Sequence, residues 1–408
     1  MSEWKEKTLG ELSIRVSSGL TPLKSNKKFW ENPSIPWLKT DQLGEKYIFD
    51  TNTKISKEAL EQTSLRIYPE NTISIAMYGE GKTRGNISII KAPMTTNQAC
   101  CNIEIDPKLA DVEYVYYYLK TQYDSLRKLS SGVRKNLNSN DIKNYKIYIP
   151  ESVSVQKSII RILTSLDNKI KLNNQINQEL EAMAKTLYDY WFVQFDFPDQ
   201  NGKPYKSSGG KMVYNQDLKR EIPEGWGVEN LFDVAEVQYG YPFSTDYFNS
   251  TGEGVPVIRI RDILGNDITN YSTEEVEDKY RINVGDVLIG MDGNFHMNYW
   301  IKEDCYLNQR VVKVNSDKLP NMVLKYQIKP FIKLREKSVS RTTVGHLSDK
   351  DLKAINVILP KDKYLSSIFE KFESILENII INQQQNQELT QLRDWLLPML
   401  MNGQVKVE

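Results

Sequence analysis

The feature that most constrains this chain is a long helical segment that occurs twice. The first copy runs from Glu151 to Phe192, and the second begins at Lys361 and continues towards the C-terminus. Each copy follows a short strand-like stretch that ends on a proline, Pro150 or Pro360, at an offset of 360 − 150 = 210 residues. A fixed long period indicates an internal repeat. We therefore predict a duplicated chain whose two halves share one plan.

Both copies are predicted to be long helices that pair with each other. Apolar residues recur in them at three- and four-residue spacing, which is typical of a coiled-coil seam. Amide residues interrupt each seam, as NNQINQ and NQQQNQ, and buried amides fix the register of a coiled coil at some cost in stability. The predicted seam comprises Ile159, Leu163, Leu166, Ile170, Asn173, Asn177, Leu180, Leu187, Phe372, Leu376, Ile379, Asn386, Leu389 and Leu396. We expect an antiparallel pair, with two unrelated core helices as the alternative.

The residues before each helix predict two similar mixed α/β domains. Apolar or alternating runs at 35–43 and 71–79 read as strands, and runs at 255–264 and 285–293 repeat them. Tyrosines and leucines at helical spacing predict a helix from Val112 to about Leu129, with most of its tyrosines in the core. We predict domains at 1–150 and 224–360, helices at 151–198 and 361–408, and between them a turn-rich connector at 199–223. The fold class is thus mixed α/β with a pseudo-two-fold internal repeat.

Composition limits the class of protein. Lys and Arg number 53, and so do Asp and Glu, so the formal net charge is zero. This balance disfavours a nucleic-acid partner unless local clusters or partner subunits supply the phosphate contacts. No run approaches ~18 consecutive apolar residues, and the first residues show no signal region. The three cysteines lack metal spacing, which suits a reducing compartment. We expect a cytoplasmic protein with no membrane segment.

The sequence offers no catalytic constellation, whereas its loops suit recognition. The two histidines, His296 and His346, lack metal-ligand spacing, and no phosphate-binding loop occurs, so we predict a non-enzymatic chain without a metal. The strand-like segments match between the halves while the loops diverge. The unlike pairs are 78–85 against 291–300, and 130–136 against 340–346. Loops on a rigid frame carry recognition.

The polar residues of these loops are candidates for DNA contacts. Arg and Lys read guanine, Asn and Gln read adenine, and Ser and Thr bind phosphates. An isolated surface charge is more often simply solvated, and the recurring Asn97-Gln98 and Asn308-Gln309 pairs could equally be frame residues. The candidates are Thr21, Tyr78, Lys82, Thr83, Arg84, Arg134, Lys135, Asn136, Tyr241, Arg259, Arg261, Asn294, His296, Asn298, Gln309, Arg310, Arg341, Thr342, Thr343 and His346.

Several motifs together resemble the specificity subunit of type I restriction-modification systems. They are the GLTP turn, IPWLKTDQL, the LNSNDIKNYKIYIP lead-in, the Q-x-x-I-x-x-x-L-x-x-x-D-x-x-I pattern at Gln156–Ile170, and the segments DFPDQNGKPYKSSGGKMV and EIPEGW. The resemblance covers nearly the whole chain and implies that the connector is ordered. In the second helix the pattern departs, because Ser366 stands in the region that corresponds to Gln156.

The resemblance also implies function and partners. It implies two target-recognition domains, each reading half of a split sequence in double-stranded DNA, with the paired helices as the spacer. It implies two DNA-methyltransferase subunits, which supply the S-adenosylmethionine site, and a restriction/translocase subunit. On this basis we expect no cofactor on this chain. The alternative from a different class is a coiled-coil scaffold with two protein-binding domains, which salt-dependent DNA binding would distinguish.

Overall fold

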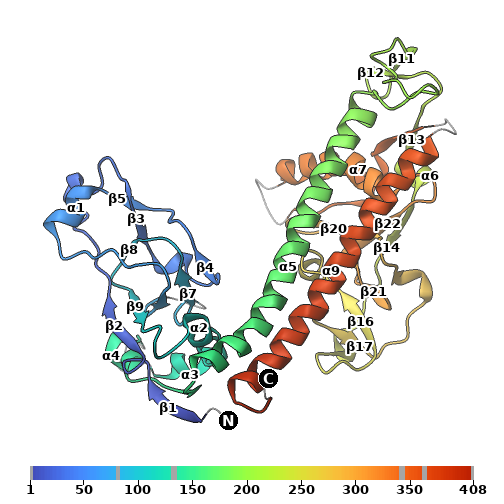
Figure 1. The fold of residues 1–408 in the computed structure, drawn as a ribbon. Coiled ribbons are helices and arrows are strands. Elements are labelled where there is room, and N and C mark those ends of the chain that lie inside the picture. Colours follow the sequence, from blue (N-terminus) through green and yellow to red (C-terminus); the bar gives the residue numbers. More distant parts are fainter. Residues whose placement is uncertain (1–2, 80–82, 130–135, 340–344, 361–364, 406–408) are drawn as a thin grey trace. The chain divides into compact units, whose positions relative to one another are not determined.

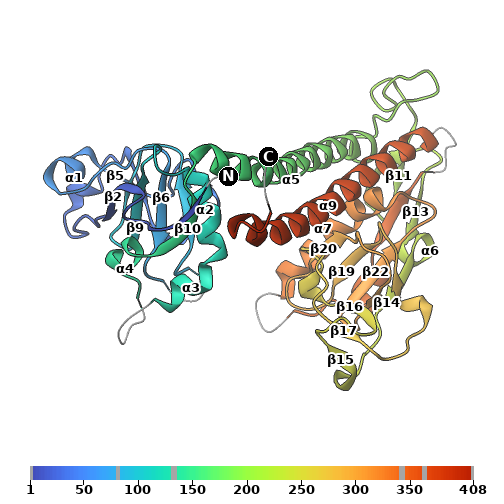
Figure 2. The same cartoon turned by 60° about the horizontal axis from the view of Figure 1, so that its bottom comes forward.

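The computed structural model describes residues 3–79, 83–129, 136–339, 345–360 and 365–405. The chain divides into two compact units (Figures 1 and 2). The N-terminal unit comprises residues 1–168 and 389–408, and the C-terminal unit comprises residues 169–388. Each unit therefore contains one globular domain and a part of each of the two long helices, α5 (Val153–Tyr188) and α9 (Ser366–Met401).

The N-terminal unit is built on a five-stranded sheet with the order β2-β9-β6-β7-β4. Its strands are β2 (Ser13–Ser18), β9 (Cys100–Ile105), β6 (Thr72–Ala76), β7 (Ile87–Ile90) and β4 (Tyr47–Ile48). Beside it are a second sheet of β5 (Lys54–Ile55), β3 (Ile35–Leu38) and β8 (Thr95–Thr96), and the pair β1 (Trp4–Thr8) with β10 (Lys146–Pro150). The helices of this domain are α1 (Lys57–Gln62), α2 (Val112–Thr121), α3 (Tyr123–Lys128) and α4 (Ser139–Lys143).

The predicted helix over residues 112–129 is present but divided. Its tyrosines at positions 114 and 116–118 are all buried, which confirms their assignment to the core. Gln122 leaves helical geometry at φ −99° and ψ 13°, so α2 ends before it and α3 begins after it. The side-chain oxygen of Gln122 accepts a hydrogen bond from the Tyr145 hydroxyl at 3.0 Å, and Leu126 beyond the break is fully buried. Tertiary contacts thus override the continuous helical pattern.

The C-terminal unit repeats this plan with two sheets, β14-β22-β19-β20 and β15-β17-β16-β21-β18. The first contains β14 (Glu236–Tyr239), β22 (Val311–Asn315), β19 (Val287–Gly290) and β20 (Met297–Tyr299). The second contains β15 (Phe248–Asn249), β17 (Tyr271–Ser272), β16 (Val255–Ile258), β21 (Cys305–Leu307) and β18 (Arg281–Ile282). The pair β13 (Gly227–Asn230) with β23 (Asn356–Leu359) and the helices α6 (Leu231–Val234), α7 (Asn321–Val339) and α8 (Asp349–Lys353) complete the domain.

Equivalent strands pair in the same way in the two domains. β3 runs parallel to β8, and β16 runs parallel to β21, as the repeated sequence segments require. Two glycines show how close this correspondence is. A Cβ on Gly19 would lie 2.3 Å from the Thr96 carbonyl oxygen, and one on Gly240 would lie 2.0 Å from the Asn308 carbonyl oxygen. Both positions therefore require glycine, and the predicted duplicated α/β fold is confirmed.

Helices α5 and α9 lie side by side and antiparallel, joined in the middle by amide side chains (Figures 1 and 2). Asn173 donates to the side-chain oxygen of Asn386 at 3.0 Å. Asn382 donates to the side-chain oxygen of Asn177 at 2.9 Å, and Asn177 donates to the Ile379 carbonyl at 3.2 Å. Residue numbers increase along α5 where they decrease along α9, so the two helices are antiparallel. Asn173 and Asn177 of α5 are buried, so these bonds fix the register.

The apolar seam residues serve mainly the two ends of the helix pair. Ile159 and Leu163 join the N-terminal core with Leu400 and Met401 of α9. In the C-terminal unit the corresponding residues are part of that domain's core. They are Phe372, Leu376 and Ile379. The remaining predicted seam residues are half-buried, namely Leu166, Ile170, Leu180, Leu187, Leu389 and Leu396.

The segment after each long helix packs against a tryptophan at the start of the opposite repeat. The segment after α9 contacts Trp4, and the segment after α5 contacts Trp226. Beyond α9, a Cβ on Gly403 would lie 2.9 Å from the Trp4 ring. Beyond α5, the rings of Phe192 and Phe197 lie 5.7 and 4.8 Å from that of Trp226. The predicted extent of the first helix, to residue 198, was wrong. α5 ends at Tyr188, one π-helical turn follows, and Phe195 takes a positive φ of 67°, which turns the aromatic residues towards Trp226.

The connector is structured, as the resemblance implied. It forms the hairpin β11 (Met212–Asn215) with β12 (Arg220–Pro223). The Asp196 carboxylate accepts hydrogen bonds from the backbone N–H and the hydroxyl of Ser207 at 2.7 and 2.6 Å, which closes the preceding loop. These bonds lower the pKa of Asp196.

The structure shows the role of Gln156, the first residue of the Q-x-x-I-x-x-x-L-x-x-x-D-x-x-I pattern. It is fully buried, donates to the Pro150 carbonyl at 2.8 Å and accepts from the Asp111 N–H at 2.7 Å. It therefore joins the start of α5 to β10 and to the N-cap of α2. In the second half Gln327 of α7 exchanges two hydrogen bonds with the backbone of Ile358, at 2.9 and 2.6 Å. In the second half, a glutamine from another helix, α7, thus makes a buried pair of backbone hydrogen bonds of this kind.

We predict that Gln156→Ala lowers the free energy of unfolding by about 2–4 kcal/mol, because two buried backbone groups lose their partners. Gln175→Ala, an exposed glutamine of the same helix, should change it by less than about 0.5 kcal/mol. Urea denaturation of the two variants and the parent chain measures the difference. Equal stability of the two variants would contradict the assigned role.

Candidate nucleic-acid interface

In both domains the described flanks of the loops that diverge in sequence lie beside each other at the same end of the central sheet. The Leu137 N–H donates to the Met77 carbonyl at 3.1 Å, and the Leu347 N–H donates to the Met291 carbonyl at 2.7 Å. The loop after β6 therefore lies beside the segment before α4. The loop after β19 lies in the same way beside the segment before α8. The structure thus brings together the described flanks of the loop pairs that the sequence singled out.

The recurring Asn-Gln pair lies at this end of each sheet, and its two residues have different roles. The side-chain oxygens of Asn97 and Asn308 accept from the backbone N–H two residues later, at 3.1 and 3.3 Å. These asparagines therefore shape a turn of the frame. Gln98 and Gln309 are exposed, and Gln98 accepts a hydrogen bond from the Thr21 hydroxyl. Both glutamines therefore lie at the surface, with the side-chain oxygen of Gln98 already engaged by Thr21.

A single carboxylate organises the C-terminal loop cluster. Asp292 accepts from the Arg310 guanidinium at 2.7 Å and contacts Nδ1 of His346 at 2.7 Å. The side chain of Asp292 is 22% exposed, whereas those of Arg310 and His346 are 57% and 53% exposed. The half-buried carboxylate thus holds two exposed groups, which come from different loops, in a fixed arrangement. The cluster presents oriented hydrogen-bonding groups to solvent.

Arg259 and Arg261 lie next to a second carboxylate that organises its surroundings, that of Asp262. Asp262 is buried and accepts from the Arg259 N–H at 2.9 Å and from the Thr269 hydroxyl at 2.8 Å. The Arg259 guanidinium lies 4.4 Å from the centroid of the Phe248 ring, and burial lowers the pKa of Arg259. The Arg261 side chain is 61% exposed. Of the two, Arg261 is the freer to reach a ligand.

Other C-terminal candidates are engaged to different degrees. Asn298 donates to the carbonyl of Ile263 at 3.0 Å, so its amide holds β20 in place. Tyr241 donates to Glu274 at 2.9 Å, and this bond raises the pKa of the phenol. Asn294 is exposed, and its carbonyl accepts from the His296 N–H at 2.8 Å in a tight turn.

The N-terminal candidates are described only in part. Tyr78 is 39% exposed, and Thr83, Arg84 and Asn136 are half-buried at the edges of their loops. Arg127 of α3 donates to the Arg84 carbonyl at 3.3 Å and so supports this loop. The predicted residues Lys82, Arg134, Lys135, Arg341, Thr342 and Thr343 lie outside the described residues.

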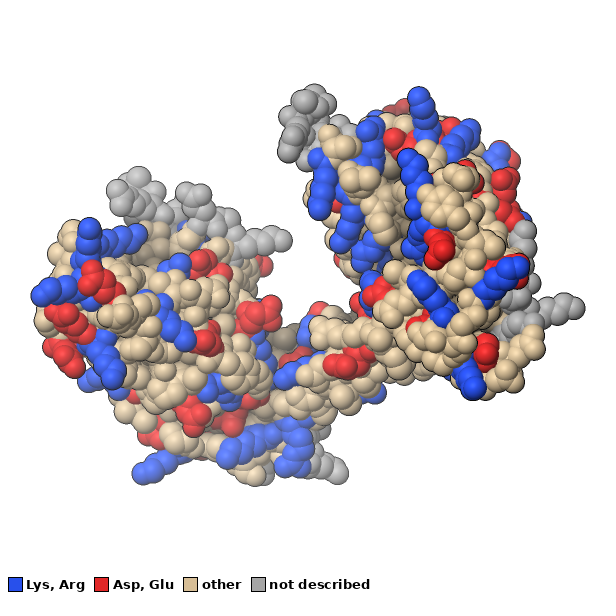
Figure 3. All heavy atoms as spheres, turned by 90° about the horizontal axis from the view of Figure 1, so that it is seen from above, with Lys and Arg blue, Asp and Glu red and all other residues tan. Residues whose placement is uncertain are grey.

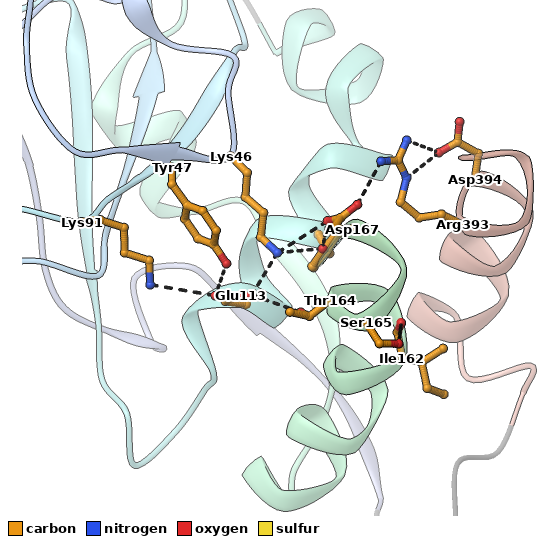
Figure 4. Close-up of polar contacts among 11 residues, drawn as sticks. Lys46, Tyr47, Lys91, Glu113, Ile162, Thr164, Ser165, Asp167, Arg393 and Asp394 are labelled. Atoms are coloured by element: carbon orange, nitrogen blue, oxygen red, sulfur yellow. Dashed lines mark hydrogen bonds and ion pairs between the residues drawn. The ribbon is translucent and has the colours of Figure 1, made fainter. Parts of the chain in front are cut away.

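A polar network that sequence reasoning missed ties the N-terminal domain to both long helices (Figure 4). Asp167 of α5 accepts from Arg393 of α9 at 3.0 Å and lies 3.6 Å from Lys46. Lys46 also lies 3.0 Å from Glu113 of α2, and the Tyr117 hydroxyl donates to Asp167. Burial, followed by the hydrogen bond to Asp167, raises the pKa of Tyr117. Asp167 belongs to the recurrent helix pattern, but the sequence does not show its partners.

The surface shows where charge is concentrated despite the zero net charge. Figure 3 shows Lys and Arg side chains gathered over one side of the C-terminal unit. Within the described part of the chain, His, Cys, Asp and Glu form no group that could hold a metal ion. No helix among the described residues is long and apolar enough to span a membrane.

The fold and the loop clusters define a duplicated recognition protein, and comparison places it in a family. Residues 1–182 and 223–391 match the family described as type I restriction modification DNA specificity domain. The match covers most of the chain in two segments, so the protein belongs to this family.

Individual relatives agree with this assignment. The chain is 28% identical to the type I restriction enzyme MjaIX specificity subunit of Methanocaldococcus jannaschii, over 100% of this chain and 94% of the relative. It is 21% identical to the HindI specificity subunit of Haemophilus influenzae, over 99% and 100%. The crystal structure of a type I restriction-modification S subunit from M. genitalium shares the fold, with a TM-score of 0.60, 16% identity, and coverage of 98% and 96%.

We predict that Asp292→Asn lowers the discrimination between target and non-target DNA by about 10- to 100-fold, because Arg310 and His346 lose their common anchor. Competition binding with the assembled complex measures this ratio. Asp304→Asn is the matched control, since Asp304 pairs with Arg281 on β18 and not with the loop cluster. Unchanged discrimination in Asp292→Asn, or an equal loss in both variants, would contradict the role of the cluster.

Proposed function

We propose that this chain is the DNA-recognition subunit of a type I restriction-modification complex and that it reads a two-part target. One observation carries the proposal: a duplicated frame presents unlike loops at the equivalent end of each domain. Like framework residues place the loops, and unlike loop residues give each domain its own half of the target. Membership of the specificity-domain family supports this assignment.

Direct readout would depend on the loop clusters. Arginine donates two hydrogen bonds to guanine, and an exposed glutamine pairs with adenine. Arg310 is held by Asp292 before any ligand binds, which lowers the entropy lost on binding. Gln309, next to it, is exposed. The remaining predicted loop residues are candidates for further base and phosphate contacts.

We further propose that the chemistry belongs to partner subunits. Two DNA-methyltransferase subunits would bring S-adenosylmethionine, and a restriction/translocase subunit would join them in the cytoplasm, where the DNA is. The long helices offer apolar side chains for such docking. In the C-terminal unit Leu172 and Ile176 are 50% and 38% exposed, and in the N-terminal unit Leu392 and Trp395 are 43% and 59% exposed. Exposed apolar residues grouped on one element indicate an interaction surface.

The helix pair would act as a spacer between the two readers. Each helix has 36 residues, and at ~1.5 Å per residue it is about 54 Å long. Readers on one side of a duplex contact half-sites about one helical turn, ~34 Å, apart. A spacer with a fixed register would therefore set how many base pairs separate the two halves of the target.

We predict that exchanging residues 1–150 for those of another family member changes one half of the methylated sequence and leaves the other half and the spacing intact. Single-molecule methylome sequencing of a strain that carries the exchanged gene reads both halves directly. The reciprocal control exchanges residues 224–360 and should change only the other half. A change in both halves from one exchange would contradict the two-reader proposal, and methylation with no split target would favour the scaffold alternative.

A further inference from the structure

Helix α7 carries a row of lysines, two of which, Lys329 and Lys333, have no role in the loop clusters or in the contacts described above. Lysines stand at every fourth position, Lys325, Lys329, Lys333 and Lys337. Residues four apart lie on one face of a helix. α7 has five basic residues and one acidic residue, compared with five and three in α5 and two and five in α9. In a chain of zero net charge, this helix is therefore a local concentration of positive charge.

Two of the basic residues of α7 have roles within the fold. Lys325 lies with its Nζ 3.7 Å from the centroid of the Tyr299 ring, and burial lowers its pKa to about 8. Arg335 lies 3.1 Å from the Asp351 carboxylate. Lys329 and Lys333 differ from both: they are exposed, and neither forms an ion pair with another residue that the structure describes. Their charge is available to a ligand.

Lys329 and Lys333 line an open groove of about 600 Å³ between α7 and α5. From α5 the groove receives Gln178, Glu181 and Lys185. Lys185 is paired with Asp189, and the negative charge of Glu181 raises the pKa of the half-buried Lys325 against the effect of burial. The groove therefore keeps an excess of positive charge on its α7 side.

The position of this groove relates it to the loop cluster. α7 ends at Val339, and His346, which contacts Asp292, follows seven residues later. Along the chain, the lysine row therefore precedes a residue of the C-terminal loop cluster by a short stretch. The equivalent helices of the N-terminal domain, α2 and α3, carry three basic and two acidic residues, so this concentration of charge is specific to the C-terminal domain.

We propose that Lys329 and Lys333 bind the phosphate backbone of duplex DNA outside the base pairs that the loops read. The inference rests on the proposed function and adds a contact that is independent of sequence. The two lysines stand four residues apart on one helix face, a rise of about 6 Å along the axis, and their ammonium groups act as point charges, as suits a row of phosphates. The place of α7 in the same domain as the loop cluster, and shortly before His346 of that cluster along the chain, favours DNA over an acidic protein as the occupant.

The test uses the double variant Lys329→Gln/Lys333→Gln of the full chain, assembled with its methyltransferase. Binding is measured over a range of salt concentrations with a duplex that carries the methylome-defined target and with the same duplex after scrambling the target. Losing two phosphate contacts should reduce the slope of log K against log salt by about 1.8 for both duplexes. The ratio of the two affinities should stay the same, because phosphate contacts carry no sequence information.

The matched control is Lys203→Gln/Lys206→Gln, which removes the same charge from two exposed lysines of the connector. An unchanged slope in the α7 variant, or an equal fall in the control, would overturn the inference. Failure of the α7 variant to assemble with the methyltransferase, with DNA binding intact, would assign the groove to a protein partner instead. A parent complex without target preference would contradict the proposed function itself, so the two failures are distinguishable.

Discussion

Hydrogen bonds between asparagines, buried on α5 and half-buried on α9, fix the register of the two long helices. Asn173 and Asn177 pair with Asn386 and Asn382 in the middle of two long helices. A purely apolar seam can slide by one turn and bury almost the same area. A slip here would leave buried amides without partners, at a cost of about 1–3 kcal/mol each. The amides therefore lower the stability of the helix pair somewhat and restrict it to a single register.

The two domains hold this helix pair by different means. In the N-terminal unit a partly buried network of Lys46, Glu113, Asp167 and Arg393 joins three helices and a strand region. In the C-terminal unit an aromatic and aliphatic cluster takes that place, with Trp191 against Phe372 at 5.8 Å. The stabilisation from a polar network depends on the direction of its hydrogen bonds, whereas that from an apolar cluster depends on the area it buries. The duplicated helices thus keep a common length while their attachments to the domains have diverged.

Repetition made most of the architecture predictable. The offset between halves predicted the paired strands, the long helices and the amide seam, and helical spacing placed the tyrosines of α2 in the core. The details that failed depend on contacts between distant residues. The break at Gln122 and the early end of α5 at Tyr188 follow from tertiary packing, which local periodicity does not encode.

In the candidate interface, too, the sequence predicted positions along the chain but not contacts between distant residues. Sequence located the loops, since they are the segments in which the two halves differ. It did not show that Asp292 joins Arg310 and His346, because these residues are 18 and 54 positions away along the chain. Asn298, a predicted base reader, donates its amide to the backbone of Ile263 instead. The four-residue spacing of the α7 lysines was readable, but only the structure shows which of them remain unpaired.

A paired insertion tests the spacer role most directly. Four residues, about one helical turn, are added to α5 between Gln175 and Ile176, and four to α9 between Gln383 and Gln384, so that both helices lengthen together. Methylome sequencing should then show the same two half-sites separated by a longer spacer. An active variant that methylates the original spacing would contradict the view that the helix pair sets the distance between the two halves of the target.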